Sequence, residues 1–214
     1  MQKIIQINPP ITDLKIHSKY RNIIFDLGRV LFHVNPDKVV TDFFGHEDPV
    51  PFGLTKSMFK VWADVDRGVI SPDGAAQILA QEYDKQKVDV FLGAVLDRLT
   101  PIDQGVSIFK AIKQKGYKTY ILSNLSQQSH NKISGYDFMQ DFDGAVFSYQ
   151  YSSIKPEPAI YQALLNLYNL KPEECLFIDD LPDNIAAAKT HGIDGIICSD
   201  HAYVREQLLD LHVL

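Results

Sequence analysis

Long apolar segments, abundant cysteine and an excess of positive charge are all missing from this sequence. No apolar run approaches the roughly 20 residues that a membrane-spanning helix requires, and the first ten residues lack the apolar region and cleavage site of a secretory signal. The net charge of −6 at pH 7 repels nucleic acids and anionic lipid headgroups, so neither is an expected partner. We therefore expect a cytoplasmic protein without a transmembrane segment, for which export would need another route.

The two cysteines, Cys175 and Cys198, both lie in apolar stretches. Such positions are typical of reduced core residues in a reducing compartment. Hydrophobic residues make up 45% and charged residues 22% of the 214 residues, which is typical of a globular protein. The length suits one α/β domain, or a core domain with a small insert.

Short apolar segments alternate with helical patterns over most of the chain. The apolar segments have the length of buried parallel strands and cover Ile23–Phe25, Tyr117–Leu122, Gly144–Phe147, Cys175–Ile178 and Gly195–Cys198. Helices are expected at Asp103–Lys115, Glu157–Leu170, Asp183–His191 and Ala202–Leu211. This alternation predicts an α/β fold, in which a Rossmann-like parallel sheet carries helices on both faces.

Residues 35–99 interrupt this alternation because they hold no convincing strand. Four helices are expected there, at Asp37–Phe44, Thr55–Val65, Ser71–Tyr83 and Val88–Leu99. The third has a typical start, with Ser71 as the capping residue and Pro72 in the first turn. We interpret residues 35–99 as an α-helical cap inserted after the first core strand. Residues 22–34 and 100–214 then form the core domain, and residues 1–21 form an N-terminal extension with two short candidate strands.

Polar residues lie at or beyond the ends of four of the five expected strands. They are Asp26, the Ser123–Asn124 pair, Lys155 and the Asp179–Asp180 pair. In open parallel sheets, ligands bind at the edge where the strands end, so these residues are expected to share one site. Carboxylates without histidine or cysteine ligands suit a hard cation such as Mg²⁺. A carboxylate, a cation and a lysine are the groups that phosphoryl transfer needs.

The same residues carry a resemblance to the haloacid dehalogenase-like superfamily, which extends from Asn22 to the end of the chain. The matching motifs are Ile24–Leu31, Ile121–Asn124, Lys155–Tyr161 and Phe177–Asn184. The first motif is most similar to a subgroup that includes glucose-1-phosphate phosphatases and the amino-terminal phosphatase domain of soluble epoxide hydrolase. The resemblance implies a phosphatase that hydrolyses a phosphomonoester of a small molecule or of a phosphoprotein.

The resemblance also implies a covalent mechanism. Asp26 would attack phosphorus and form an aspartyl-phosphate, which water would then hydrolyse. Ser123, the backbone N–H of Asn124 and Lys155 would bind the phosphate, aided by the start of the helix that follows.

The metal and its surroundings follow from the same resemblance. Asp26, Asp180 and the backbone carbonyl of Gly28 would bind Mg²⁺. Asp179 would orient Lys155 or a metal-bound water. Asn184 would hold these residues in place without contacting the metal itself.

Gly28 is also where the chain departs from most phosphatases of this superfamily, which have an aspartate there as general acid and base. Losing such a group can cost roughly 10²–10⁴-fold in rate. Three readings remain open: a 2-haloacid dehalogenase, a catalytically impaired phosphate-binding module, and a phosphatase whose leaving group needs little protonation or is protonated by another residue. The Asp179–Asp180 pair argues against the dehalogenase, because dehalogenase members lack it and use no metal.

Residues beside the first motif and in the cap are candidates for the missing proton donor and for substrate contacts. His33 is a candidate donor, and Arg29 is a candidate contact for the anionic substrate. Cap residues that could select the substrate are Phe43, Phe44, Trp62, Asp64, Asp66 and Arg67. Expected substrates are a sugar phosphate or an aryl ester such as protein phosphotyrosine, and the sequence gives no indication of the oligomeric state.

Overall fold

A five-stranded parallel sheet forms the core of the computed structural model, which describes residues 18–34, 56–86, 88–89, 96 and 99–214. The strands are β1 (Asn22–Phe25), β2 (Lys118–Ser123), β3 (Gly144–Phe147), β4 (Cys175–Asp179) and β5 (Asp194–Ile197). Their spatial order is β3-β2-β1-β4-β5, so the first strand lies at the centre. Every neighbouring pair is parallel, as the sequence predicts.

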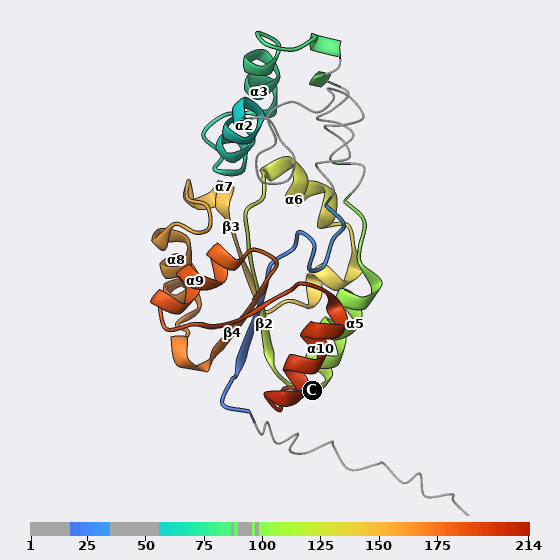
Figure 1. Ribbon diagram of the computed structural model, residues 1–214, viewed down its shortest axis with the longest axis vertical. Helices are drawn as coiled ribbons and strands as arrows, with labels where there is room; N and C mark the ends of the chain where they lie inside the picture. The colour runs from blue at the N-terminus through green and yellow to red at the C-terminus, as the bar shows by residue number, and fades with distance from the viewer. Residues whose placement is uncertain (1–17, 35–55, 87, 90–95, 97–98) are drawn as a thin grey trace, which may run out of the picture.

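Helices cover both faces of this sheet (Figure 1). The pair α8 (Pro158–Tyr168) and α9 (Pro182–Thr190) lies on one side, and the pair α5 (Asp103–Gln114) and α10 (His201–Asp210) lies on the other. Alternate strand residues point to opposite faces. Ile24 therefore joins the buried cluster that contains Tyr161 of α8, whereas Phe25 joins the cluster that contains Phe109 of α5. These two cores confirm the Rossmann-like α/β fold.

The observed strands end slightly differently from the predicted ones. β2 runs one residue further, to Ser123, and β4 runs one residue further, to Asp179, whereas β5 ends one residue earlier, at Ile197. The cause is pairing with the neighbouring strand, since Ser123 aligns with Phe147 and Asp179 aligns with Ile197. Two of the polar residues expected beyond the strands are thus the last residues of the strands themselves.

Several short elements have no clear signature in the sequence. They are α6 (Gln127–Ile133), α7 (Ser148–Tyr151) and the 3-10 helices η2 (Asp137–Asp141) and η3 (Pro172–Glu174). Helix α6 follows the Ser123–Asn124 pair and is capped by Ser126, whose hydroxyl accepts the backbone N–H of Ser129 at 3.2 Å. A helix of this length has too few turns to show an apolar period.

Two helices, α2 (Lys56–Asp66) and α3 (Pro72–Leu79), belong to the segment interpreted as a cap (Figure 1). Helix α3 starts as predicted, because Ser71 Oγ accepts the backbone N–H of Gly74 at 3.0 Å, but it ends at Leu79 rather than at Tyr83. The predicted helix at 37–44, most of the one at 88–99 and both candidate strands of the N-terminal extension lie outside the described residues. The domain boundaries therefore stay a prediction.

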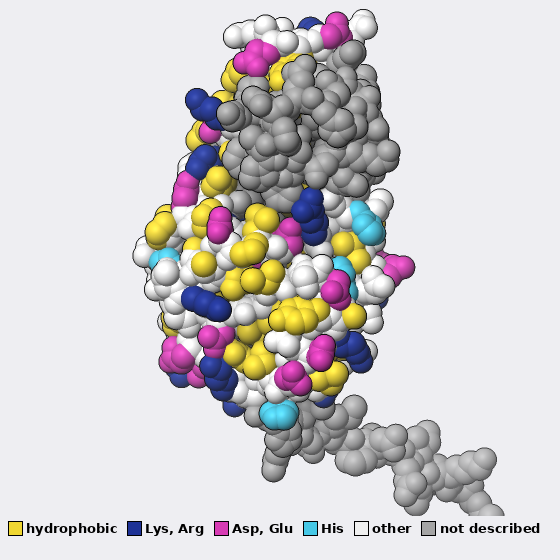
Figure 2. Space-filling model, in the orientation of Figure 1, with side chains coloured by type: hydrophobic (Ala, Val, Ile, Leu, Met, Phe, Trp, Pro, Cys, Tyr) yellow, Lys and Arg dark blue, Asp and Glu magenta, His cyan; other side chains and the backbone are white. Residues whose placement is uncertain are grey.

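The two cysteines are buried free thiols, as predicted for reduced core residues. Within the described part of the chain, no helix is long and apolar enough to cross a membrane. On the face shown in Figure 2, acidic, basic and apolar side chains of the core are interspersed, so charge is distributed over this face rather than gathered at one place.

Candidate active site

The polar residues at the strand ends meet at the carboxyl edge of the sheet. Asp26 directly follows β1, and its backbone N–H donates to the carbonyl of Ile178 in β4 at 2.9 Å. Ser123 and Asp179 end the strands on either side of β1. Lys155 comes from the loop between α7 and α8. The parallel topology therefore brings together four positions that are up to 153 residues apart in the sequence.

Lys155 lies at the centre of this group. Its Nζ is 2.8 Å from Asp26 Oδ1 and 2.6 Å from Asp179 Oδ2, and its side chain is only 1% exposed. Burial alone would lower the pKa of Lys155, but the charges of Asp179 and Asp26 outweigh burial and raise the pKa. The ammonium group is thus permanently charged and held between two carboxylates.

Asn124 fixes the loop that carries this lysine. Asn124 Oδ1 accepts the backbone N–H of Lys155 at 2.7 Å, and Asn124 Nδ2 donates to the Lys155 carbonyl at 3.0 Å. The Asn124 side chain is therefore a positioning group. Its backbone N–H remains the group that the sequence assigns to the phosphate.

Asp179 is held from three directions. It accepts hydrogen bonds from Asn184 Nδ2 at 2.9 and 3.0 Å and from the backbone N–H of Leu181 at 2.8 Å, in addition to its contact with Lys155. The side chain is fully buried. Because its oxygens are engaged in this way, Asp179 is suited to orient Lys155 rather than to bind a cation, and Asn184 is suited to orient Asp179.

Three carboxylates crowd this edge of the sheet. Asp26, Asp179 and Asp180 offer oxygen atoms that lie within 4.8 Å of one another. Burial, together with the charges of Asp26 and Asp179, raises the pKa of Asp180 to about 7. Arg29 Nη1, 3.8 Å from Asp180 Oδ2, offsets only part of this repulsion. An all-oxygen group with excess negative charge fits a hard divalent cation such as Mg²⁺.

Opposing influences act on the ionisation of Asp26. Burial raises the pKa of Asp26, and the charge of Asp179 adds to this effect. The charge of Lys155 and hydrogen bonds from Lys155 and Ser123 act in the opposite direction, and the net result is a raised pKa. A cation at the same edge would favour the ionised carboxylate that nucleophilic attack requires.

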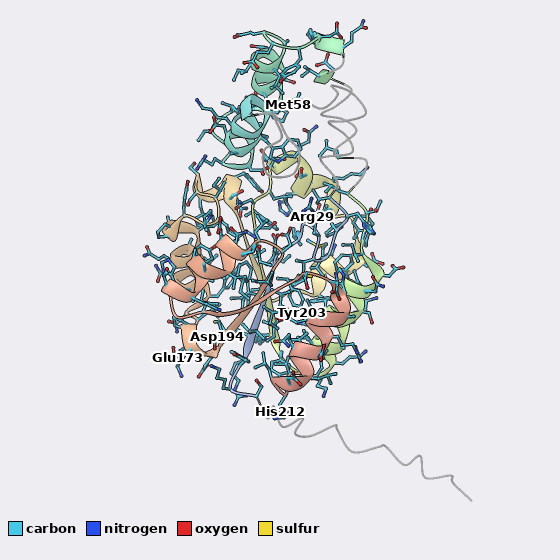
Figure 3. All side chains as sticks on the ribbon, viewed as in Figure 1. Arg29, Met58, Glu173, Asp194, Tyr203 and His212 are labelled. Atoms are coloured by element: carbon cyan, nitrogen blue, oxygen red, sulfur yellow. The ribbon has the colours of Figure 1, made fainter. Side chains whose placement is uncertain are left out.

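A cavity of about 570 Å³ opens above these residues. Its polar floor contains Asp26, Gly28, Ser123, Lys155 and Asp180. Its apolar lining comes from α2 as well as from the loops at the sheet edge and from α6, and it includes Phe32, Val34, Trp62, Leu99, Leu125 and Ile133. The view in Figure 3 places Arg29 below the cap helices, at the level where the core meets the cap.

The remaining candidates from the sequence fall into two groups. Arg29, Trp62 and Asp66 line the cavity. His33 is exposed and is absent from the described lining, and its backbone N–H donates to the carbonyl of Thr100 at 2.8 Å. Asp64 is likewise absent from the described lining. Phe43 and Phe44 lie outside the described residues.

Contacts between cap and core were not foreseen from the sequence. Arg67, the residue that follows α2, forms an ion pair and a hydrogen bond with Glu157, which lies two residues after Lys155. Ser148 Oγ donates to the carbonyl of Asp66 at 2.5 Å. Glu157 lies inside the Lys155–Tyr161 motif, and this position is the only feature of the sequence that singles it out. Nothing in the sequence indicates that its partner is Arg67.

Comparisons with known proteins identify the family of the chain. The model of the haloacid dehalogenase-like hydrolase family matches residues 20–192. The chain is 34% identical over 103 residues to bifunctional epoxide hydrolase 2 of Rattus norvegicus, a match that covers 46% of this chain but only 19% of that protein. It is 25% identical to the sesquiterpene phosphatase astK of Aspergillus oryzae over 85% of this chain and 91% of that protein.

Solved structures show the same fold. One is an HAD family enzyme of Bacteroides thetaiotaomicron in complex with magnesium and inorganic phosphate, with a TM-score of 0.66 and 21% identity over 83% of this chain and 93% of that one. At this level of identity the likeness concerns the fold alone. The family match, by contrast, covers most of the chain and all four motifs, and the chain belongs to the haloacid dehalogenase-like hydrolases.

Proposed function

We propose that this hydrolase is a Mg²⁺-dependent phosphatase that hydrolyses phosphomonoesters through an aspartyl-phosphate on Asp26. The observation that carries the proposal is the contact of Asp26 with the buried ammonium of Lys155 at 2.8 Å, on the floor of a cavity that also contains Ser123 and Asp180. The family match and the phosphatases among the relatives support a phosphatase.

Asp26, Asp180 and the backbone carbonyl of Gly28 would hold the cation. The fit rests on the donor set, because Asp180 and Asp26 are partly uncompensated carboxylates whereas Asp179 is already engaged by Lys155, Asn184 and a backbone N–H. When bound, Mg²⁺ neutralises negative charge on the phosphate and on the carboxylates around it.

The side chains of this chain have distinct tasks in the reaction. Asp26 attacks phosphorus in line with the leaving oxygen and becomes phosphorylated. Ser123 and the backbone N–H of Asn124 hold phosphate oxygens, and Lys155 stabilises the negative charge of phosphate and nucleophile together. Asp179 and Asn184 keep the lysine in place through the hydrogen bonds described above. A water then attacks the phospho-enzyme and restores Asp26.

The cavity favours an apolar organic group on the substrate. Beyond the polar floor, its described walls are formed largely by aliphatic and aromatic side chains. A sugar would leave many of its hydroxyl groups against such walls without hydrogen-bond partners, at a cost of about 1–3 kcal/mol for each buried group. We therefore favour an aryl or other apolar phosphomonoester over a sugar phosphate, in line with the sesquiterpene phosphatase among the relatives.

The test is a phosphatase assay on the full chain with p-nitrophenyl phosphate, an isoprenyl monophosphate and glucose 1-phosphate. Activity is expected with Mg²⁺, is expected to disappear in EDTA, and should fall below about 1% in Asp26→Asn, which is isosteric but cannot form the acyl-phosphate. A folded wild-type protein that hydrolyses none of these esters would favour the phosphate-binding module. Release of chloride from 2-chloropropionate in EDTA would favour the dehalogenase instead.

A further inference from the structure

Gly28 leaves the reaction without a side-chain proton donor on the core side of the cavity. An added Cβ at this position would lie 3.4 Å from Val34 Cγ2 and 4.0 Å from Asp26 Oδ2, which shows how close the missing group would be to the nucleophile. Among the described residues that line the cavity, the acidic ones are Asp26, Asp66, Asp180 and Asp183. Asp26 and Asp180 belong to the nucleophile and cation site, and Asp183 is exposed. Asp66 is the remaining carboxyl group, and it comes from the cap.

Asp66 is held firmly over the site. It is the last residue of α2, and its carbonyl accepts the hydroxyl of Ser148 from the core at 2.5 Å. The next residue, Arg67, is joined to Glu157 of the loop that carries Lys155. The end of α2 is therefore tied to the core at two consecutive residues, Asp66 and Arg67.

The Asp66 carboxyl group also contacts the phosphate-binding segment directly. It accepts hydrogen bonds from the backbone N–H of Ser126 and from the side chain of Trp62. Ser126 is only three residues after Ser123, which limits the separation of their Cα atoms to about 11 Å. Asp66 and Asp26 line the same cavity, Asp26 from the core and Asp66 from the end of α2, so an ester bound on Asp26 has space to extend its leaving group toward Asp66.

We propose that Asp66 is the general acid and base of this phosphatase, and that it performs from the cap the task for which Gly28 has no side chain. The inference rests on the proposed function, because it assigns the proton transfers of that reaction.

The proton transfers balance as follows. When the Asp26 Oδ–P bond forms and the ester P–O bond breaks, the Asp66 carboxylic acid gives its proton to the departing oxygen, and an alcohol leaves. In the second step, the Asp66 carboxylate takes a proton from water as the water oxygen attacks phosphorus. The P–O bond to Asp26 then breaks, which yields inorganic phosphate, the Asp26 carboxylate and the protonated Asp66.

The surroundings of Asp66 keep it able to carry a proton at neutral pH. Burial raises the pKa of Asp66 to about 7, against the opposing hydrogen bonds from Trp62 and Ser126 and with a further contribution from the charge of Asp26. Neighbouring ionisable groups have other partners: Arg67 is engaged by Glu157 and Asp64, and His130, whose pKa is lowered by burial, is hydrogen-bonded to Tyr149. A carboxyl group with a pKa near the working pH is suited to act first as acid and then as base.

The experiment compares two substrates that differ by one methylene group. The p-nitrophenolate of p-nitrophenyl phosphate leaves without a proton, whereas the alkoxide of p-nitrobenzyl phosphate needs one. Asp66→Asn should lower kcat/KM about 10²-fold or more for the benzyl ester and less than about 5-fold for the phenyl ester. Asp64→Asn is the matched control, since it makes the same replacement two residues away on the same helix at a residue absent from the described cavity lining, and it should affect both esters equally and weakly.

The pH dependence of kcat/KM provides a second test of the proposal. For the benzyl ester, wild-type kcat/KM should fall as pH rises through about 7, because Asp66 then loses the proton that it must donate. This fall should be absent for the phenyl ester and absent in Asp66→Asn, whereas titration of the metal site would affect both esters alike. Hydrolysis of the phenyl ester by Asp66→Asn shows that the variant is folded.

Equal losses on both esters would overturn the proposal, because a residue that only shapes the Ser126 loop does not distinguish leaving groups. An Asp66→Asn variant with the wild-type ratio of kcat/KM for the two esters would overturn the proposal as well. In both cases wild-type hydrolysis of the phenyl ester and its loss in Asp26→Asn would leave the proposed function intact. A wild-type protein inactive on both esters would instead defeat the proposed function itself, and this inference with it.

Discussion

Replacing Asp180 by asparagine measures how far the negative charge of this buried carboxylate destabilises the folded protein. Burial and the charges of Asp26 and Asp179 raise the pKa of Asp180 from 3.8 to about 7. A raised pKa means that the ionised form destabilises the folded state. A shift of about three pH units corresponds to at most ~4 kcal/mol at about 1.4 kcal/mol per unit. The Asp180 side chain is 11% exposed, so solvent screens only part of this cost.

The cost depends on pH in a definite direction. Below the unfolded-state pKa of about 4, Asp180 is protonated in both states and its contribution to stability is fully present. That contribution is lost as the pH rises to about 7. In EDTA, Asp180→Asn should therefore gain stability over wild type with rising pH, by about 2–3 kcal/mol between pH 5 and pH 8. The lost contact with the half-exposed Arg29 subtracts less than about 1 kcal/mol.

The assay is urea denaturation at pH 5 and pH 8, in EDTA and in Mg²⁺, with the exposed Asp141→Asn as the control. Mg²⁺ at about 100 times its Kd should stabilise wild type by about 2.7 kcal/mol and should stabilise Asp180→Asn much less. Asp180→Asn should also lack phosphatase activity. If Asp180→Asn were no more stable than wild type at pH 8 in EDTA, the reasoning from burial and repulsion would be refuted. Equal stabilisation of both proteins by Mg²⁺ would show that Asp180 is not a ligand.

Three further substitutions probe neighbouring groups. Lys155→Met should cost about 3–5 kcal/mol of stability at pH 8, because it leaves two buried carboxylates without their shared cation, and urea denaturation measures this loss. His33→Ala should keep kcat/KM for p-nitrobenzyl phosphate within about 3-fold of wild type, since His33 is exposed; a loss of 10²-fold would make His33 the acid instead. Gly28→Asp in the Asp66→Asn background should restore at least about 10-fold of the lost benzyl ester rate, since a Cβ added at Gly28 would lie 4.0 Å from Asp26 Oδ2.

The sequence was sufficient for the core of the fold because each strand is a short buried segment between helices of clear pattern. The central strand β1 has a buried apolar run at Ile23–Phe25, and the first polar residue after this run marks the carboxyl edge. The topology of a parallel sheet brings such residues together without further information. This is why the strand ends with Asp26, Ser123 and Asp179 could be placed before the structure was known.

The position of the segment interpreted as a cap could not be predicted from the sequence in the same way. Its position depends on a few contacts between surfaces rather than on a period in the sequence, and single polar residues such as Glu157 give no sign of their partners. The sequence named Asp66 as one of six cap candidates, together with Asp64 and Arg67. Only the structure separates them, by placing Asp66 in the cavity and joining Arg67 to the core.

Residues close to Asp66 and Lys155 in the sequence link the segments that carry these two side chains. Arg67 follows Asp66, and Glu157 lies two residues after Lys155, so one ion pair joins the segment of the proposed proton donor to the segment of the lysine proposed to bind phosphate. Ser126, which donates to Asp66, belongs to the segment whose Asn124 fixes the Lys155 backbone. Because a partly exposed ion pair contributes about 1 kcal/mol, the Arg67–Glu157 contact is better suited to set the position of α2 on the core than to stabilise the fold. The position of Asp66 in the cavity thus depends on contacts between the end of α2 and the core rather than on α2 alone.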